Sequence, residues 1–170
     1  GYAGNDTYVV NLTAAGGLED VVSESGGSGT DTLQLLGSST NKSAATLTLA
    51  SGFENLDASA TASSLLNLTG NSSANLIKGN AASNVITGGA GKDTLTGGGG
   101  KDIFDFNAPA EMGTASGTWD VISDFSRGND KIDLSTLDAN TTTKVDEAFS
   151  GRLIASKDSF TAAGQLKLAS

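Results

Sequence analysis

The chain has 170 residues, of which 37% are hydrophobic and 5% aromatic, so it is long enough for one domain but its core must be thin. The formal net charge of −9 argues against nucleic acid as a partner and favours cations. The absence of Cys and His excludes disulfides, thiol chemistry and histidine-based metal or catalytic sites. No run of eighteen apolar residues is present, so no membrane insertion is expected.

Residues 1–35 are predicted to form two irregular coils, each made of turns followed by strands. GYAGNDTYVVN supplies the first turn and strand, with Tyr8 pointing inward, and GGSGTDTLQLL supplies the last. Glu24 stands eighteen residues after Asp6, and Asp20 and Asp31 lie nearby in the sequence. A metal could bind among these carboxylates; the alternative is a set of solvated acidic turns.

Between residues 37 and 69 the repeats lapse, and small polar residues alternate with apolar ones as they do in strands. The core residues predicted for this stretch are Phe53, Leu56, Leu65 and Leu68. Together with the coils before it, the stretch makes up a predicted N-terminal region of irregular β-roll coils, residues 1–69.

Residues 70–105 repeat four times with a period of nine, as GNSSANLIK, GNAASNVIT, GGAGKDTLT and GGGGKDIFD. The first six positions are Gly, small residues, Asn or Asp, which suit a tight turn because Gly, and to a lesser extent Asn and Asp, tolerate positive φ. Position eight is large and apolar and would point inward from a short strand. Two units then make one coil, and residues eighteen apart stack. The predicted apolar columns are Leu68, Ile86, Phe104 and Ile122 on one side, and Ile77 and Leu95 on the other.

The same step stacks the polar residues at position six into two columns. These are Asp57, Asn75, Asp93 and Glu111 at one edge, and Asn84, Asp102 and Asp120 at the other. Carboxylates about 4.8 Å apart repel by about 3 kcal/mol at an effective dielectric constant near 20. Lys92 and Lys101 each precede an Asp but are expected to point away from the turn interior. A bound Ca²⁺ would neutralise the charge, because it takes oxygen ligands and glycine turns expose carbonyls beside each carboxylate.

The candidate calcium ligands are carboxylates and turn carbonyls of the two Gly-rich units and of the segment that follows. They are Gly88, Gly89, Ala90, Gly91, Asp93, Gly97, Gly98, Gly99, Gly100, Asp102, Glu111 and Asp120. Asn75 and Asn84 offer an oxygen but no charge, and a stacked amide ladder without metal is the alternative for them. Asp120 keeps the step of eighteen, so it is predicted to face Asp102 across one rung and to share its ion.

Residues 106–170 are predicted to close the roll. Residues 135–170 indicate strands and turns that pack across its open end and cover its edge. The core residues predicted for this cap are Leu137, Phe149, Leu153, Ile154, Phe160 and Leu166. Asp124, Asp130 and Asp133 are interpreted as turn and cap residues rather than as ligands.

GGAGKDTLT and GGGGKDIFD resemble the nonapeptide GGxGxDxUx of calcium-binding RTX proteins. DVISDFSRGNDKIDLS and AFSGRLIASKDSFTAAGQLKL are similar to the segments that follow the roll in the C-terminal domain of serralysin-type secreted proteases. The resemblance implies an all-β, right-handed parallel β-roll with a C-terminal β cap, in which residues 1–69, 70–105 and 106–170 form one continuous module. It also implies several bound Ca²⁺ ions.

In function, the resemblance implies a non-catalytic module of a secreted bacterial protein that is exported unfolded by a type I secretion machinery and folds on calcium outside the cell. The alternative is a calcium-dependent cell-surface, S-layer or adhesin segment, for which self-association is possible. An enzyme that acts on polysaccharide with paired carboxylates is less favoured, because the turns already account for the carboxylates. Protease activity is not implied, because the similarity covers only the C-terminal domain of serralysins and the chain lacks His.

Overall fold

The computed structural model describes residues 3–24, 28–40, 42–113 and 117–136. Apart from one short 3₁₀ helix, η1, the regular structure within these ranges is all β. The elements are β1 Thr7–Asn11, β2 Thr32–Leu36, β3 Ala45–Thr48, β4 Asn55–Ala60, β5 Leu66–Thr69, β6 Leu76–Lys78, β7 Val85–Thr87, β8 Thr94–Thr96, β9 Ile103–Asp105, η1 Pro109–Met112, β10 Val121–Ile122 and β11 Lys131–Asp133. No helix in the described ranges is long and apolar enough to cross a membrane.

Residues 1–133 form one compact unit, and a second begins at Leu134. Of the second unit the structure describes only residues 134–136. The core residues predicted for the C-terminal cap, from Leu137 to Leu166, lie outside the described residues. The cap and the three-part division of the chain therefore stay predictions.

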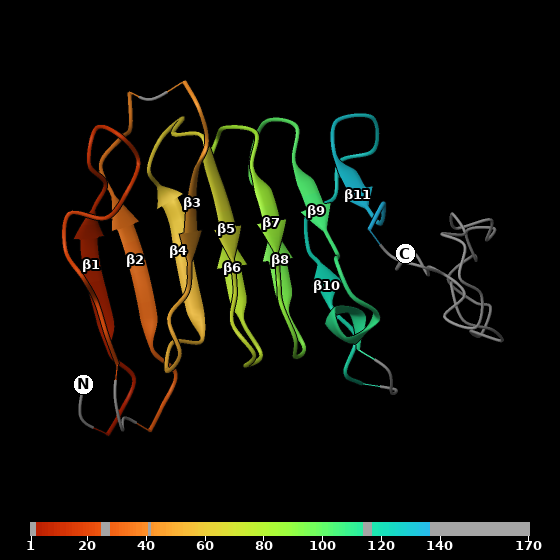
Figure 1. Cartoon of the computed structure of the whole chain (residues 1–170), viewed down its shortest axis with the longest axis horizontal. Helices are drawn as coiled ribbons and strands as arrows, with labels where there is room; N and C mark the ends of the chain where they lie inside the picture. Colours follow the sequence, from red (N-terminus) through yellow and green to blue (C-terminus); the bar gives the residue numbers. More distant parts are fainter. Residues whose placement is uncertain (1–2, 25–27, 41, 114–116, 137–170) are drawn as a thin grey trace, which may run out of the picture. The chain divides into compact units, whose positions relative to one another are not determined.

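Within the first unit, the strands form two parallel sheets (Figure 1). One sheet has the order β1-β2-β4-β6-β8-β10, and the other has the order β11-β9-β7-β5-β3. From β3 onward, consecutive strands alternate between the two sheets, and neighbouring strands in each sheet are parallel. The chain therefore winds as a β-solenoid, which confirms the predicted all-β parallel roll.

The length of a coil is constant only in the middle of the solenoid. The N–H of Asn75 donates to the carboxylate of Asp93, 18 residues further on. By contrast, the N–H of Asp6 donates to Asp31 after 25 residues, and that of Asp93 donates to Asp120 after 27. The period of 18 residues therefore describes the repeats but does not extend to the coils on either side.

Side chains at position eight of the repeats fill the core, as predicted. Ile77, Ile86, Leu95 and Phe104 at this position are completely buried, as is Leu68 before the repeats. Ile77 lies beside Leu95 in one sheet, and Ile86 lies beside Phe104 in the other. Complete burial of such a side chain stabilises a fold by about 1.5 to 3 kcal/mol, so this thin double layer carries much of the stability of the roll.

The predicted position of Ile122, the last member of the apolar column that contains Phe104, is wrong. Ile122 pairs with Leu95, and it is Ile132 of β11 that pairs with Phe104. The connection from β9 to β10 spans residues 106–120 and contains η1, so it is longer than a repeat turn. Because of this longer connection, Ile122 enters the sheet opposite to that of Phe104.

Aromatic rings contribute to the core of the N-terminal coils. The ring of Tyr8 meets that of Phe53 edge-on, with 5.2 Å between the ring centres. The hydroxyl of Tyr8 donates to the carboxylate of Glu24, and this hydrogen bond raises the pKa of Tyr8 to about 12. Leu66 is completely buried, whereas the predicted Leu65 is not. Side chains alternate between the two faces of a strand, and in β5 the inward ones are those of Leu66 and Leu68.

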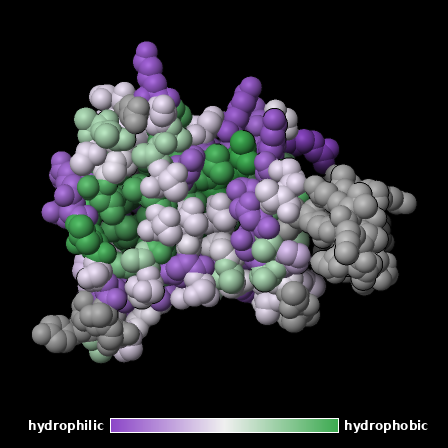
Figure 2. Space-filling view, viewed as in Figure 1, coloured by the Kyte–Doolittle hydropathy of each residue, from purple (hydrophilic) through white to green (hydrophobic). Residues whose placement is uncertain are grey.

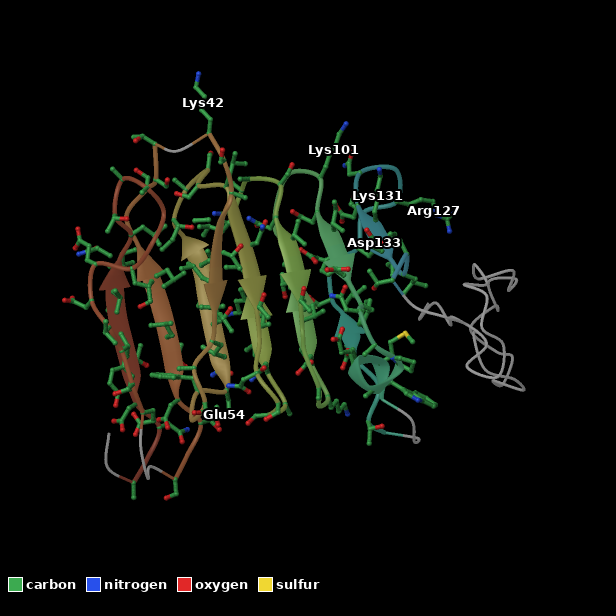
Figure 3. The ribbon with its side chains drawn as sticks, in the orientation of Figure 1. Lys42, Glu54, Lys101, Arg127, Lys131 and Asp133 are labelled. Carbon is green, nitrogen blue, oxygen red and sulfur yellow. The ribbon has the colours of Figure 1, made fainter. Side chains whose placement is uncertain are left out.

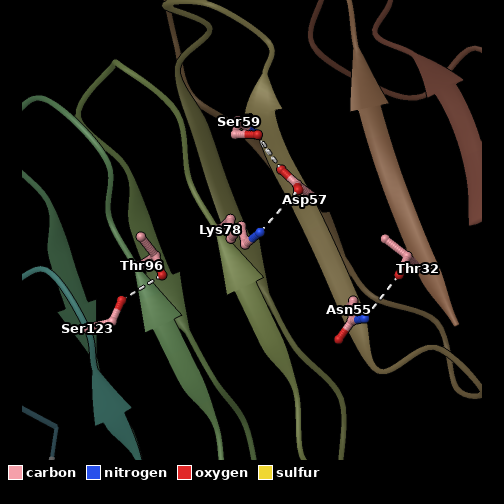
Figure 4. A network of polar contacts seen from close by, with 7 residues as sticks. All are labelled: Thr32, Asn55, Asp57, Ser59, Lys78, Thr96 and Ser123. Carbon is pink, nitrogen blue, oxygen red and sulfur yellow. Dashed lines mark hydrogen bonds and ion pairs between the residues drawn. The ribbon is translucent and has the colours of Figure 1, made fainter. Parts of the chain in front are cut away.

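The predicted place of Asp57 in the column of Asn75 is also wrong. The side-chain amide of Asn75 donates to the carbonyl of Glu54, 21 residues earlier, at 3.2 Å. Counting back eighteen residues from Asn75 gives Asp57. This coil has 21 residues, however, so Glu54 occupies that position. Asp57 instead lies on the outer face, where its Oδ2 is 3.6 Å from Nζ of Lys78 (Figure 4).

The outer face of the six-stranded sheet carries a series of such polar contacts. The side-chain amide of Asn55 donates to the hydroxyl of Thr32 at 3.0 Å, and the hydroxyls of Thr96 and Ser123 are 2.7 Å apart (Figure 4). Figure 2 shows apolar side chains gathered over the end of the roll that holds β1 and β2, and a smaller group nearer the middle, with polar side chains between them.

Gly79 shows how closely the coils approach each other. A Cβ at Gly79 would lie closer than 3.0 Å to the carbonyl oxygen of Gly97 and to Oδ1 of Asn84. We expect Gly79→Ala to lower the free energy of unfolding by about 1 to 3 kcal/mol, because overpacking forces the backbone to shift. Gly17→Ala is the matched control, since the nearest atom to its Cβ would be 3.7 Å away. Equal urea midpoints for the two variants would contradict the close approach of the coils.

Candidate metal centre

Two turns at opposite edges of the roll contain most of the predicted calcium ligands. Residues 88–93 connect β7 to β8, and residues 97–102 connect β8 to β9. The φ angle is 93° at Gly89 and 129° at Gly91, and the equivalent glycines of the second turn have 93° and 102°. Other residues rarely adopt such angles, so the repeated glycines give both turns the same course.

The glycines that open the turns make room for the carboxylates that close them. A Cβ at Gly88 would lie closer than 3.0 Å to Oδ2 of Asp93, and one at Gly97 equally close to Oδ2 of Asp102. Ala90, at the tip of the first turn, is exposed. The predicted ligands of residues 88–93 and those of residues 97–102 therefore lie in two separate turns.

Asp93 and Asp120 lie on adjacent coils at the edge that holds the first turn. Oδ1 of Asp120 accepts a hydrogen bond from the N–H of Asp93 at 2.8 Å, and Oδ1 of Asp93 accepts one from the N–H of Asn75 at 2.8 Å. Oδ2 of Asp93 and Oδ2 of Asp120 are buried and have no hydrogen-bond partner within the described part of the chain. Buried carboxylate oxygens are costly without a partner, so this pair of atoms fits a bound cation.

The basic residues next to these carboxylates in the sequence lie elsewhere. Lys92 and Lys101 are both exposed, as predicted. Figure 3 shows Lys101 pointing away from the roll, with Lys131 and Arg127 also at the outside. Lysine side chains of the repeats therefore do not supply the positive charge that the buried carboxylates require.

The opposite edge holds a second acidic pair. Oδ1 of Asp130 accepts a hydrogen bond from the N–H of Asp102 at 3.0 Å, after a separation of 28 residues. Asp130 thus takes the place above Asp102 that was predicted for Asp120. That predicted pairing is wrong for the same reason as the position of Ile122, namely the long connection between β9 and β10.

The comparison with known families agrees with this architecture. Residues 3–167 match the family described as peptidase M10 serralysin C terminal. The chain belongs to the serralysin C-terminal family. No protein with a curated description matches it. The serralysin C-terminal domain is a non-catalytic, RTX-type β-roll of secreted proteins, and the family is known for calcium-binding repeats.

Glu111 is another predicted ligand that the structure places differently within this serralysin C-terminal domain. It lies in η1, and its Oε2 accepts a hydrogen bond from the N–H of Asn107 at 2.7 Å. Asp120, and not Glu111, stands one coil above Asp93. Glu111 still contributes negative charge near the site, because it raises the pKa of both Asp93 and Asp120.

Asp124 and Asp130, interpreted from the sequence as turn and cap residues, both accept hydrogen bonds from backbone N–H groups of the turn at residues 97–102, but this position above the turn was not predicted. The carboxylate of Asp124 accepts hydrogen bonds from the N–H groups of Gly97 and Gly98, at 2.9 and 2.7 Å. For Asp130 a signal is present in the sequence: Gly128 has φ of 91° two residues before it, just as Gly91 precedes Asp93. The spacing of Gly, Asp and an inward apolar residue therefore marks a degenerate repeat that a search for the full nonapeptide does not find.

Burial and mutual repulsion perturb these carboxyl groups. Burial raises the pKa of Asp93 to about 6, and the charge of Glu111 adds to this effect. Burial raises the pKa of Asp120 to about 7, and the charges of Asp93 and Glu111 add to it. Burial also raises the pKa of Asp102, with Asp130 and Asp124 as additional causes. The metal-free fold thus resists the ionisation of several of its carboxyl groups.

A pH dependence of the metal-free domain follows from these shifts. The folded pKa values lie above the unfolded values, so the stabilisation is fully present below about pH 4 and is lost as the pH rises through about 6 to 7. After allowance for solvent screening, the loss amounts to about 3 kcal/mol. We expect metal-stripped protein to show more β-sheet circular-dichroism signal near pH 5 than near pH 7.5, and Asp93→Asn to reduce the difference. A signal that rises with pH in both proteins would contradict the buried pair.

Proposed function

We propose that this chain is a non-catalytic calcium-binding module. The observation that carries the proposal is the pair of buried Oδ2 atoms of Asp93 and Asp120, which have no partner within the described residues. The ion at this edge would be held by these carboxylates and by backbone carbonyls of residues 88–91. At the opposite edge, Asp102 and Asp130 with carbonyls of residues 97–100 would hold another.

Calcium fits these donor sets better than other common metals. The described residues contain no cluster of three or more acidic side chains that could hold a metal by themselves, so the remaining ligands would be carbonyl oxygens and water. Ca²⁺ accepts six to eight oxygen ligands in flexible geometry, whereas Mg²⁺ demands a near-ideal octahedron and keeps its water. The absence of Cys and His from the chain also disfavours zinc and copper.

We further propose that the module is part of a secreted bacterial protein and that calcium folds it outside the cell. Sites of the extracellular kind have dissociation constants of about 10⁻⁴ to 10⁻³ M, so they would stay empty in the cytosol. The net charge of −9 and the buried carboxylates would then oppose folding, and a type I secretion machinery could export the chain unfolded. Each bound ion would stabilise the fold by about 2.7 kcal/mol at a hundredfold excess over the dissociation constant.

The test is far-UV circular dichroism of the whole chain after removal of divalent metal. We expect chelation by EGTA to remove a large part of the β-sheet signal, and excess Ca²⁺ to restore it. Mg²⁺ at the same concentration should restore much less, for the geometric reason given above. An unchanged spectrum in protein shown by elemental analysis to be metal-free would overturn the proposal.

A further inference from the structure

The turns of the first two repeats differ from the Gly-rich turns that follow them. Residues 70–75 lie one coil before residues 88–93, and residues 79–84 lie one coil before residues 97–102. None of residues 70–75 and 79–84, all of which are described, adopts a positive φ. In place of glycine at position two, these turns carry Asn71 and Asn80. The polar groups inside these turns must therefore find their hydrogen-bond partners in another way.

In the first of these turns, two side-chain amides bind backbone carbonyls of the coil before it. Nδ2 of Asn71 donates to the carbonyl oxygens of Ala50 and Phe53, at 2.9 and 2.8 Å. Nδ2 of Asn75 donates to the carbonyl of Glu54 at 3.2 Å and to Oδ1 of Asn71 at 3.2 Å. The amide nitrogens thus join this turn to the coil before it.

The second turn repeats the arrangement at the opposite edge. Nδ2 of Asn80 donates to the hydroxyl of Thr61 and to the carbonyl of Ser64, both at 2.8 Å. Nδ2 of Asn84 donates to the carbonyl of Leu66 at 3.1 Å. Asn80 and Asn84 are 4% and 1% exposed, so water does not compete for these hydrogen bonds.

The amide groups supply the positive partner that the Gly-rich turns lack. A neutral amide donates its own hydrogen bonds to buried carbonyls and adds no charge, whereas Asp93 and Asp120 leave two buried oxygens without a partner. We propose that Asn71, Asn75, Asn80 and Asn84 act as built-in substitutes for calcium. They make the coils from β4 to β7 stable without metal, while the coils from β8 onward depend on it.

This division gives the calcium-dependent coils a template. β6 and β7 present backbone partners to β8 and β9 in both sheets. When calcium binds, β8 and β9 add to strands that are already formed, so the roll does not have to be nucleated a second time. The calcium dependence of β8 and the later strands rests on the proposed function. The metal independence of the coils from β4 to β7 does not.

Hydrogen exchange of the whole chain, followed by mass spectrometry in EGTA and in excess Ca²⁺, tests the inference. We expect the amides of β5, β6 and β7 to stay protected in EGTA, and those of β8, β9 and β10 to be protected only with calcium. In EGTA, Asn80→Ala should lower the protection of β5 to β7 by about tenfold or more, because buried carbonyls lose their donors. Asn71→Ala serves as a second variant with the same expectation.

Asn67→Ala is the matched control. Asn67 is partly exposed on β5, and its amide makes a long contact of 3.4 Å to the hydroxyl of Thr46, so its replacement should leave protection unchanged. Loss of protection in β5 to β7 of the wild-type chain in EGTA would overturn the inference, as would equal effects of Asn80→Ala, Asn71→Ala and Asn67→Ala. Full protection of β8 to β10 in EGTA would instead contradict the proposed calcium site, and the asparagine variants would still decide the role of the amides.

Discussion

Phe104→Ala is expected to lower the free energy of unfolding by about 3 to 5 kcal/mol in saturating calcium. The side chain is completely buried, lies between Ile86 and Ile132 in the sheet, and its ring centre is 6.3 Å from that of Phe125. A core of only two layers has few side chains that could move into the cavity, so we expect the cost near the upper end of the range. Urea unfolding followed by circular dichroism measures it.

Val121→Ala provides the control for this variant. Val121 also belongs to a strand, but its side chain is 46% exposed on the outer face, so its truncation should cost less than about 1 kcal/mol. A loss below about 1 kcal/mol for Phe104→Ala would mean that position eight of the repeats does not form the core.

Asp93→Asn and Asp120→Asn are each expected to weaken calcium binding at their edge by at least about tenfold, which is 1.4 kcal/mol. Asn keeps the acceptor for the backbone N–H group but removes the charge and one strong oxygen ligand. Because both side chains would hold the same proposed ion, the double variant should lose less than the sum of the single losses, by about 0.5 kcal/mol or more. Titration calorimetry of metal-stripped protein gives the three values.

Asp102→Asn combined with Asp120→Asn is the decisive control for this pairing. The two carboxylates lie at opposite edges of the roll, so their effects should add within about 0.5 kcal/mol. Additive losses for Asp93 and Asp120, together with non-additive losses for Asp102 and Asp120, would support the uninterrupted step of eighteen residues and contradict the observed register.

The repeats predicted the fold because their pattern determines it locally. A period of nine with six turn-forming positions and one apolar position leaves few arrangements other than a solenoid, and the buried Ile77, Ile86, Leu95 and Phe104 follow from it directly. The same reasoning found the turns at residues 88–93 and 97–102. In these segments the local backbone requirement and the core requirement agree.

The register outside the repeats could not be predicted from the period. The sequence of residues 106–120 does not show how many half-coils the chain forms there. Asp120 was therefore placed at the wrong edge, and Ile122 in the wrong sheet. Asp57 was misplaced for a related reason, because the coil from Glu54 to Asn75 has 21 residues and not the 18 of two repeats. Loop length alone does not fix the strand to which a chain returns, whereas backbone pairing does.

The position of calcium in crystals tests the central claim most directly. Crystals of the whole chain grown in excess Ca²⁺ can be measured at a long X-ray wavelength, where calcium gives an anomalous signal. We expect a peak within about 2.3 to 2.6 Å of Oδ2 of Asp93 and of Oδ2 of Asp120, and no peak in the turns at residues 70–75 and 79–84. An anomalous map with no peak beside Asp93 and Asp120, or with a peak that joins Asp120 to Asp102, would contradict the account.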